Sequence, residues 1–167
     1  MAGIFPGTLL DPSELLRRSL AAADDDGPRG TPYLVSTVAE AARDALPLAA
    51  EGEGPDIMWR FAVIQALDTY RSLLRGGGVE LAAQFFTPEP APTGSKEIDA
   101  AFAGLAEWLA GRDGWTPPSW ALDPARTTKR WYADLPLAFM RDEADVESPP
   151  AFASRGVLTS TAGLSRA

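Results

Sequence analysis

The sequence predicts an all-α protein: a compact helical domain of about five helices with an irregular C-terminal region rich in proline and tryptophan. Apolar residues recur at intervals of three and four in several segments, as on the buried face of a helix. Capping and stop signals bracket these segments, and almost none of the chain alternates as a strand does. The 167 residues are the length of one domain with a buried core. We therefore expect a single domain over 1–167, helical over 1–94, with a further helix and the Trp- and Pro-rich tract over 95–167.

The first 50 residues predict two helices. Asp11-Pro12-Ser13-Glu14 has the form of a capping box with proline in the first turn, and the helix that it starts ends by Asp24. The segment 24–30 predicts a turn, and its three adjacent carboxylates point in different directions, which favours a solvated loop over a metal site. Thr31-Pro32 is the preferred start of the second helix. The alternative is a shorter helix that begins with the cap in Thr37-Val38-Ala39-Glu40.

The strongest helix pattern runs from Ile57 to Arg75, and we expect it to form the central core helix. The run Gly76-Gly77-Gly78 is its expected stop. Trp59 falls beside the apolar stripe, where partial burial is the usual outcome. The predicted stripe consists of Ile57, Phe61, Ile64, Leu67, Tyr70 and Leu74.

Two further helices precede the tryptophan-rich tract. Val79 to Phe86 predicts a short helix, and the alternating prolines of 87–92 predict an extended linker after it. Ser95 is the expected cap of a helix that runs to about Ala110. Small residues in this helix, such as Gly104, allow another helix to approach closely.

Beyond Trp115, repeated prolines limit the helices to short pieces. Ser148 to Arg155 predicts a helical turn that Gly156 ends, and the tail from Thr159 predicts one last turn or a frayed end. Asp134 to Val146 predicts a helix. Its expected partly buried residues are Leu137, Phe139, Met140 and Ala144.

Charge and composition narrow the possible functions. Fifteen basic and 23 acidic residues give a net charge of −8, so a nucleic-acid backbone meets net repulsion. The chain has no His and no Cys, which removes the common catalytic triads and soft metal ligands, and it has no phosphate-loop or metal motif. We therefore expect no enzyme activity, no cofactor and no metal. A DNA-binding regulator is another possibility, with Ser13 to Arg18 as the nearest approach to a recognition helix.

The sequence also predicts a cellular compartment. Uninterrupted apolar stretches, such as Phe61 to Ile64, are no longer than four residues and are too short to cross a bilayer, and the N-terminus lacks the basic start and apolar run of a signal peptide. The absence of Cys fits a reducing compartment. We therefore expect a cytoplasmic protein without a membrane partner.

The tract from Trp115 to Leu158 contains WTPPSW, RWY, SPPAF and SRGVL. Aromatic side chains on a proline-stiffened backbone predict a surface that holds a partner. The alternative is that these aromatic residues join the C-terminal region to the helical core. Both interpretations use the same residues, and only the direction of the side chains separates them.

Over about residues 95–164, the order of these motifs resembles small bacterial antitoxin-like proteins that are encoded beside nucleotidyltransferase-fold toxins. The matching pattern is GLAEWLA in a helix, W-x-x-x-x-W, an Asp-Pro step, RWY, SPPAF and a closing RGVL. The chain departs from the pattern at Ala153-Ser154-Arg155, where a more basic run is expected, and at Tyr132, where Phe is common. These departures leave the choice of partner open.

The resemblance implies a non-catalytic antitoxin that binds a cognate nucleotidyltransferase toxin and covers its active site. The toxin would attach nucleotides to an RNA or a protein. The alternative function for this chain is that of a transcriptional regulator or of another protein-interaction module without a toxin partner. Trp, Tyr and Arg dominate many interfaces because they combine a large buried area with few rotatable bonds and a polar end. The expected partner-binding residues are Trp115, Trp120, Trp131, Tyr132, Phe152 and Arg155.

Overall fold

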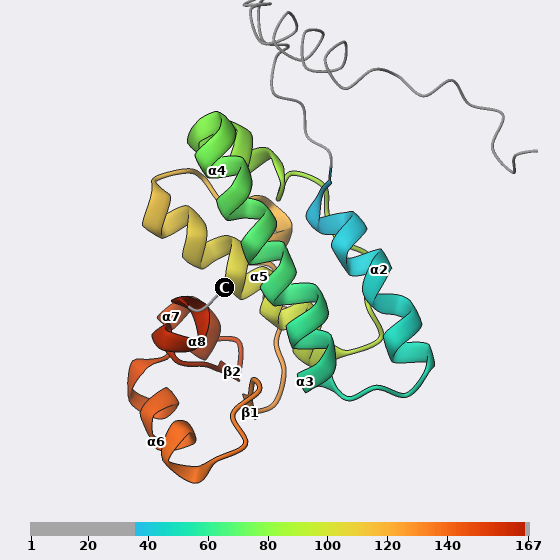
Figure 1. Cartoon of the computed structure of the whole chain (residues 1–167), viewed down its shortest axis with the longest axis vertical. Helices are drawn as coiled ribbons and strands as arrows, with labels where there is room; N and C mark the ends of the chain where they lie inside the picture. The colour runs from blue at the N-terminus through green and yellow to red at the C-terminus, as the bar shows by residue number, and fades with distance from the viewer. Residues whose placement is uncertain (1–35, 166–167) are drawn as a thin grey trace, which may run out of the picture. The chain divides into compact units, whose positions relative to one another are not determined.

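Two long helices, α4 (Gln65–Gln84) and α5 (Lys96–Asp113), lie at the centre of the computed structural model, which describes residues 36–165 (Figure 1). The described residues are mainly α-helical, as predicted. No helix among them combines the length and hydrophobicity that crossing a bilayer requires. The other elements are α2 (Val38–Ala50), α3 (Pro55–Met58), the π-helical segment η1 (Trp59–Ile64), the 3-10 helix η2 (Ser119–Leu122), β1 (Trp131–Tyr132), α6 (Ala138–Glu147), α7 (Pro150–Ala153), β2 (Val157–Leu158) and α8 (Thr161–Ser165).

Helix α2 begins later than the preferred prediction. The Thr37 backbone is extended, with φ −129° and ψ 163°, and the Thr37 N–H donates to the Glu40 carboxylate at 2.8 Å. The Thr37 side chain in turn accepts a hydrogen bond from the Glu40 N–H. This capping box satisfies two backbone donors that a helix running through from Thr31 would not need to cap, so the longer helix is wrong. The predicted elements at 11–24 and 24–30 lie outside the described residues.

The helix predicted from Ile57 is present, but its buried face differs from the predicted stripe. Residues 59–64 are π-helical, and hydrogen bonds from each residue to the fifth along make a wider turn than an α-helix. The wider turn shifts the register, so that Trp59 is 4% exposed and Phe61 is 56% exposed. The observed buried face is Met58, Trp59, Ala62, Val63, Ala66, Leu67 and Tyr70.

The glycine run interrupts α4 at a single residue. Gly78 has φ 75° and ψ −175°, a backbone conformation that is open almost only to glycine. The backbone is helical on both sides of it, over 65–77 and 79–84. The predicted stop is therefore confirmed at Gly78, and a short helix follows it as expected.

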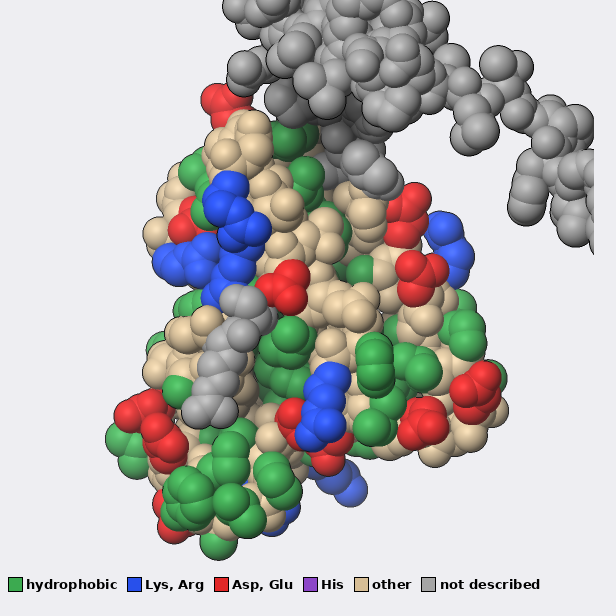
Figure 2. Space-filling view, in the orientation of Figure 1, with side chains coloured by type: hydrophobic (Ala, Val, Ile, Leu, Met, Phe, Trp, Pro, Cys, Tyr) green, Lys and Arg blue, Asp and Glu red, His purple; other side chains and the backbone are tan. Residues whose placement is uncertain are grey.

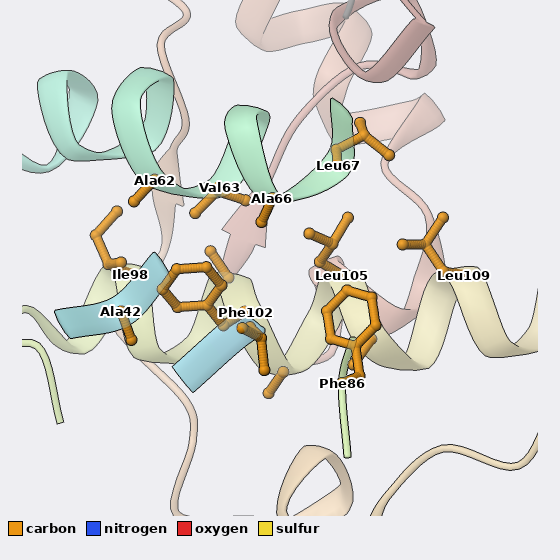
Figure 3. Close-up of a cluster of buried hydrophobic side chains, with 14 of the residues drawn as sticks. Ala42, Ala62, Val63, Ala66, Leu67, Phe86, Ile98, Phe102, Leu105 and Leu109 are labelled. Carbon is orange, nitrogen blue, oxygen red and sulfur yellow. The ribbon is translucent and has the colours of Figure 1, made fainter. Parts of the chain in front are cut away.

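Helix α5 contributes more buried residues to the core than any other described helix. Its N-cap, Ser95, accepts a hydrogen bond from the Ile98 N–H, and Gly114, with φ 79°, ends it. Figure 3 shows the side chains of η1 and the start of α4 facing α5 across a layer of aliphatic and aromatic groups. The labelled residues in this layer are Ala42, Ala62, Val63, Ala66, Leu67, Phe86, Ile98, Phe102, Leu105 and Leu109.

Short elements attach the C-terminal third to α5. Phe152 of α7 lies over Gly104, where a Cβ atom would stand 2.8 Å from the Phe152 ring, so the predicted close approach occurs here. Strands β1 and β2 pair in parallel, with Trp131 opposite Val157. Each strand has two residues, which is too short for a recognisable alternation in the sequence.

Candidate partner-binding site

Three of the six expected partner-binding residues are buried within the chain. Trp120 is 6% exposed, and its indole N–H donates to the Phe86 carbonyl at 2.9 Å. Phe152 is 0% exposed and packs edge-on against Trp59, with ring centroids 6.2 Å apart. These two side chains join the C-terminal region to the core, and neither can contact a partner while this packing is intact.

Arg155 is also buried, at 7% exposure. Its guanidinium donates to the Glu107 carboxylate at 2.7 Å and to the Ala121 carbonyl. It also donates to the carbonyls of Asp123 and Arg126, at 3.4 and 3.3 Å. Arg155 therefore holds the turn at 121–126 against α5, and its hydrogen-bonding capacity is directed inward.

Trp115 is half-buried at the edge of the core. It stacks on Phe86 at a centroid distance of 5.7 Å, and its indole N–H donates to the Tyr70 hydroxyl at 2.9 Å. The Tyr70 hydroxyl donates to Asp113 at 2.6 Å. Burial, and then the hydrogen bond to Asp113, raise the pKa of Tyr70. The Tyr70 side chain therefore stays protonated and serves as donor and acceptor in the same chain of hydrogen bonds.

Trp131 and Tyr132 lie beside α6 and are half-buried. Trp131 packs edge-on against Trp59, with ring centroids 5.9 Å apart. The Tyr132 hydroxyl donates to Asp145 at 2.9 Å and accepts from Arg130 at 2.9 Å. These contacts position the strand and α6, while part of each ring stays open to solvent.

Six large apolar side chains are exposed among the described residues, and four of them, Phe61, Leu137, Phe139 and Val146, lie on η1 and around α6. The prediction that Leu137 and Phe139 are partly buried is wrong, because they are 52% and 66% exposed. Val146 is 86% exposed, and it lies seven residues after Phe139, on the same face of the helix. Figure 2 shows hydrophobic side chains gathered over α6, with acidic groups at their margin.

A cavity of 680 Å³ opens beside this face, between η1, α6 and the start of α8. We call it the α6 groove. Its walls are mainly apolar, and Phe139 and Glu143 bring the exposed face of α6 to its edge. The groove is lined by Trp59, Arg60, Ile64, Ala133, Asp134, Leu135, Pro136, Phe139, Met140, Glu143, Thr159, Ser160, Ala162 and Gly163.

Two buried polar side chains on this lining have unused hydrogen-bonding groups. Thr159 is 1% exposed and Trp59 is 4% exposed. Neither the Thr159 hydroxyl nor the Trp59 indole N–H has a hydrogen-bond partner among residues 36–165, and neither atom is sealed from solvent. Buried polar groups ordinarily have partners, so Trp59 and Thr159 are two lining residues whose side-chain hydrogen-bonding groups are not used within residues 36–165.

An ion pair closes one side of the groove. Arg60 donates through Nε and Nη2 to the two carboxylate oxygens of Asp134, with 2.6 Å at Nε. Asp134 has φ 53°, a left-handed backbone that Asp tolerates better than most residues. Its N–H donates to the Asp56 carboxylate at 3.1 Å. The double hydrogen bond and the anchored backbone hold Arg60 against the groove wall.

The α6 groove leaves only a weak signal in the sequence. One sign was available: Leu137 and Phe139 follow Pro136 and precede an acidic stretch that supplies few other apolar side chains to a buried face. Within the described part of the chain, no cluster of three acidic side chains is placed to hold a metal ion. No protein-family model matches the chain, and no curated protein or solved structure matches it.

Proposed function

We propose that this chain is a non-catalytic protein that binds a partner protein through the α6 groove. The observation that carries the proposal is the gathering of exposed apolar side chains on and beside α6, next to a groove with mainly apolar walls that Phe139 lines. Single exposed apolar residues are common on protein surfaces, but a gathered patch beside a cavity is typical of an interaction site. Burial of one large aromatic side chain such as Phe139 contributes about 1.5–3 kcal/mol to association.

The more specific proposal is that the chain is a cytoplasmic bacterial antitoxin and that its partner is a nucleotidyltransferase-fold toxin. The support is the resemblance of residues 95–164 to antitoxin-like proteins. The charge of α6 adds a physical reason, because a nucleotide-binding pocket presents cations to phosphate groups and an acidic surface complements it. Covering that pocket stops nucleotide transfer without any chemistry in the antitoxin.

Co-expression with the protein encoded by the adjacent gene tests this proposal. If that protein is a nucleotidyltransferase, it should co-purify with the chain and lose its transfer activity in the complex. Phe139→Asp should abolish both effects, because it places a charge in the apolar part of the interface. Leu122→Asp is the matched control, since Leu122 is 52% exposed and lines a different cavity, beside Trp108. Equal effects of the two variants would place the contact elsewhere.

A further inference from the structure

The exposed face of α6 beside the groove has a length and a residue spacing that suit a helical segment. Helix α6 has ten residues and is about 15 Å long, which gives it the length of nearly three helical turns. Phe139, Glu143 and Val146 follow one another along a single face of it at the spacing of a helix. An amphipathic helix laid along this face would place its apolar stripe over Phe139 and Val146.

The charges on α6 oppose the dipole of the helix. Its first turn has no acidic residue and its last turn has no basic residue, although acids at the start and bases at the end are the stabilising arrangement. Four carboxylates follow Met140 in this helix, and Arg141 is its only base. Charged residues that do not stabilise the helix in which they lie are typical of a site that serves an interaction.

The remaining contacts leave two of these carboxylates available. Asp145 is paired with Arg130, while Arg141 donates to the Leu135 carbonyl at 2.9 Å. Asp142 and Glu143 are exposed and have no ion-pair or hydrogen-bond partner among residues 36–165. Glu143 lines the groove, so unpaired negative charge lies directly beside the apolar walls.

This charge excludes two other occupants. A membrane surface that carries anionic lipids would repel the acidic margin of the patch. A second copy of the chain would bring two acidic α6 faces together, with the same result. A partner helix with basic residues beside an apolar stripe meets neither obstacle.

We infer that the α6 groove accepts a basic amphipathic helix of the partner protein, with its apolar stripe over Phe139 and its Lys or Arg side chains facing Asp142 and Glu143. This inference rests on the proposed protein-binding function and specifies the chemistry of the segment that is bound.

Two synthetic peptides test the inference on the full chain. Both are helices of roughly 14 residues, about 21 Å long, with Leu at the same positions, and the polar positions are Lys in one and Glu in the other. Fluorescence anisotropy of the labelled peptides gives the affinities. The Leu/Lys peptide should bind and the Leu/Glu peptide should not, and Phe139→Ser should weaken binding of the Leu/Lys peptide.

A pair of charge-reversal variants separates a defined site from general attraction to an acidic protein. Asp142→Lys with Glu143→Lys changes the net charge by the same amount as Asp44→Lys with Glu53→Lys, and all four residues are exposed. Two exposed ion pairs are worth up to about tenfold in affinity, so the variant on α6 should bind up to about tenfold more weakly than the variant at 44 and 53. Equal weakening by both would overturn the inference.

The remaining outcomes are also decisive. Equal binding of the two peptides would show that charge does not select the occupant, and a dimer in sedimentation that Phe139→Ser disrupts would assign the groove to a second copy. If the Leu/Lys peptide binds at α6 and no nucleotidyltransferase co-purifies, the toxin proposal fails and this inference stands. If the toxin co-purifies and the peptide does not bind, the inference fails and the proposed function stands.

Discussion

Arg155 donates a hydrogen bond to Glu107 at 2.7 Å and so links the turn that follows α7 to the middle of α5. The same guanidinium donates to the Ala121 carbonyl. Because Arg155 is 7% exposed, these bonds form largely away from water. A residue type that often marks a binding surface therefore stabilises the fold of this protein.

Arg155→Met should destabilise the protein by about 2–4 kcal/mol, because it removes a buried donor for the Glu107 carboxylate and for several carbonyls of the turn at 121–126. Urea unfolding followed by tryptophan fluorescence measures the change in free energy. Arg43→Met is the control, since Arg43 is exposed on α2, and it should change the stability by less than about 0.5 kcal/mol. Similar values for the two variants would contradict the structural role of Arg155.

Truncation should cost much more stability at Phe152 than at Phe139. Phe152→Ala should cost about 3–5 kcal/mol, because the ring is fully buried against Gly104 and Trp59. Phe139→Ala should cost less than about 0.5 kcal/mol, because its ring is 66% exposed. Thermal unfolding of the two variants makes the comparison, and a large loss in Phe139→Ala would show that α6 needs this ring for its own packing.

The glycine run offers a matched pair of substitutions. Gly78→Ala should destabilise by about 1–3 kcal/mol, because φ 75° with ψ −175° is strained for any residue with a Cβ. Gly76→Ala should stabilise by about 0.5–1 kcal/mol, since Gly76 lies within α4 and a Cβ there would meet open space. Urea unfolding gives the change in the free energy of unfolding for each variant. Changes of the same sign in Gly76→Ala and Gly78→Ala would argue against the break in the helix at Gly78.

Asp113 should make the stability depend on pH. Hydrogen bonds from Arg112, and then from Tyr70, hold the pKa of Asp113 below its ordinary value of 3.8, although partial burial opposes them. A carboxyl with a lowered folded-state pKa stabilises the protein above its unfolded pKa, and this contribution is lost as the pH falls through the folded value.

Asp113→Asn should therefore lower the stability by about 1 kcal/mol at neutral pH, and its difference from the parent should disappear as the pH falls below about 4. The free energy of unfolding of the variant and of the parent is measured by urea unfolding from neutral pH to below pH 4. Asp142→Asn is the control, because Asp142 is exposed and has no partner among the described residues, so its curve should follow the parent. A constant deficit of Asp113→Asn at all pH values would exclude the linkage.

Local signals predicted much of the fold. Ser95 and Gly114 bound α5 where capping rules expect them, and Thr37 forms the capping box that was the alternative start of α2. Such signals depend on a few neighbouring residues, so the sequence contains them in full. The register of η1 is not contained in such local signals, because its π-helical turn accompanies the packing of Trp59 against Phe152 and Trp131, which lie far along the sequence.

The candidate site was less predictable for the same reason. Trp120 and Arg155 have the chemistry of interface residues, and only the tertiary structure shows that they point inward. Phe139 and Val146 have the spacing of a buried helix face, and only the absence of a covering element over them in residues 36–165 shows that they point outward. Sequence periodicity identifies a face, but it does not say what packs on it.

The most direct test of the account is the affinity of the adjacent-gene nucleotidyltransferase for the chain with and without an intact α6 groove, measured by isothermal titration calorimetry. We predict that Phe139→Asp weakens binding by about a hundredfold, as expected for a central interface residue, and that Leu122→Asp leaves it unchanged. Binding of the Phe139→Asp variant with the affinity of the parent chain would contradict the assignment of the α6 groove as the partner-binding site.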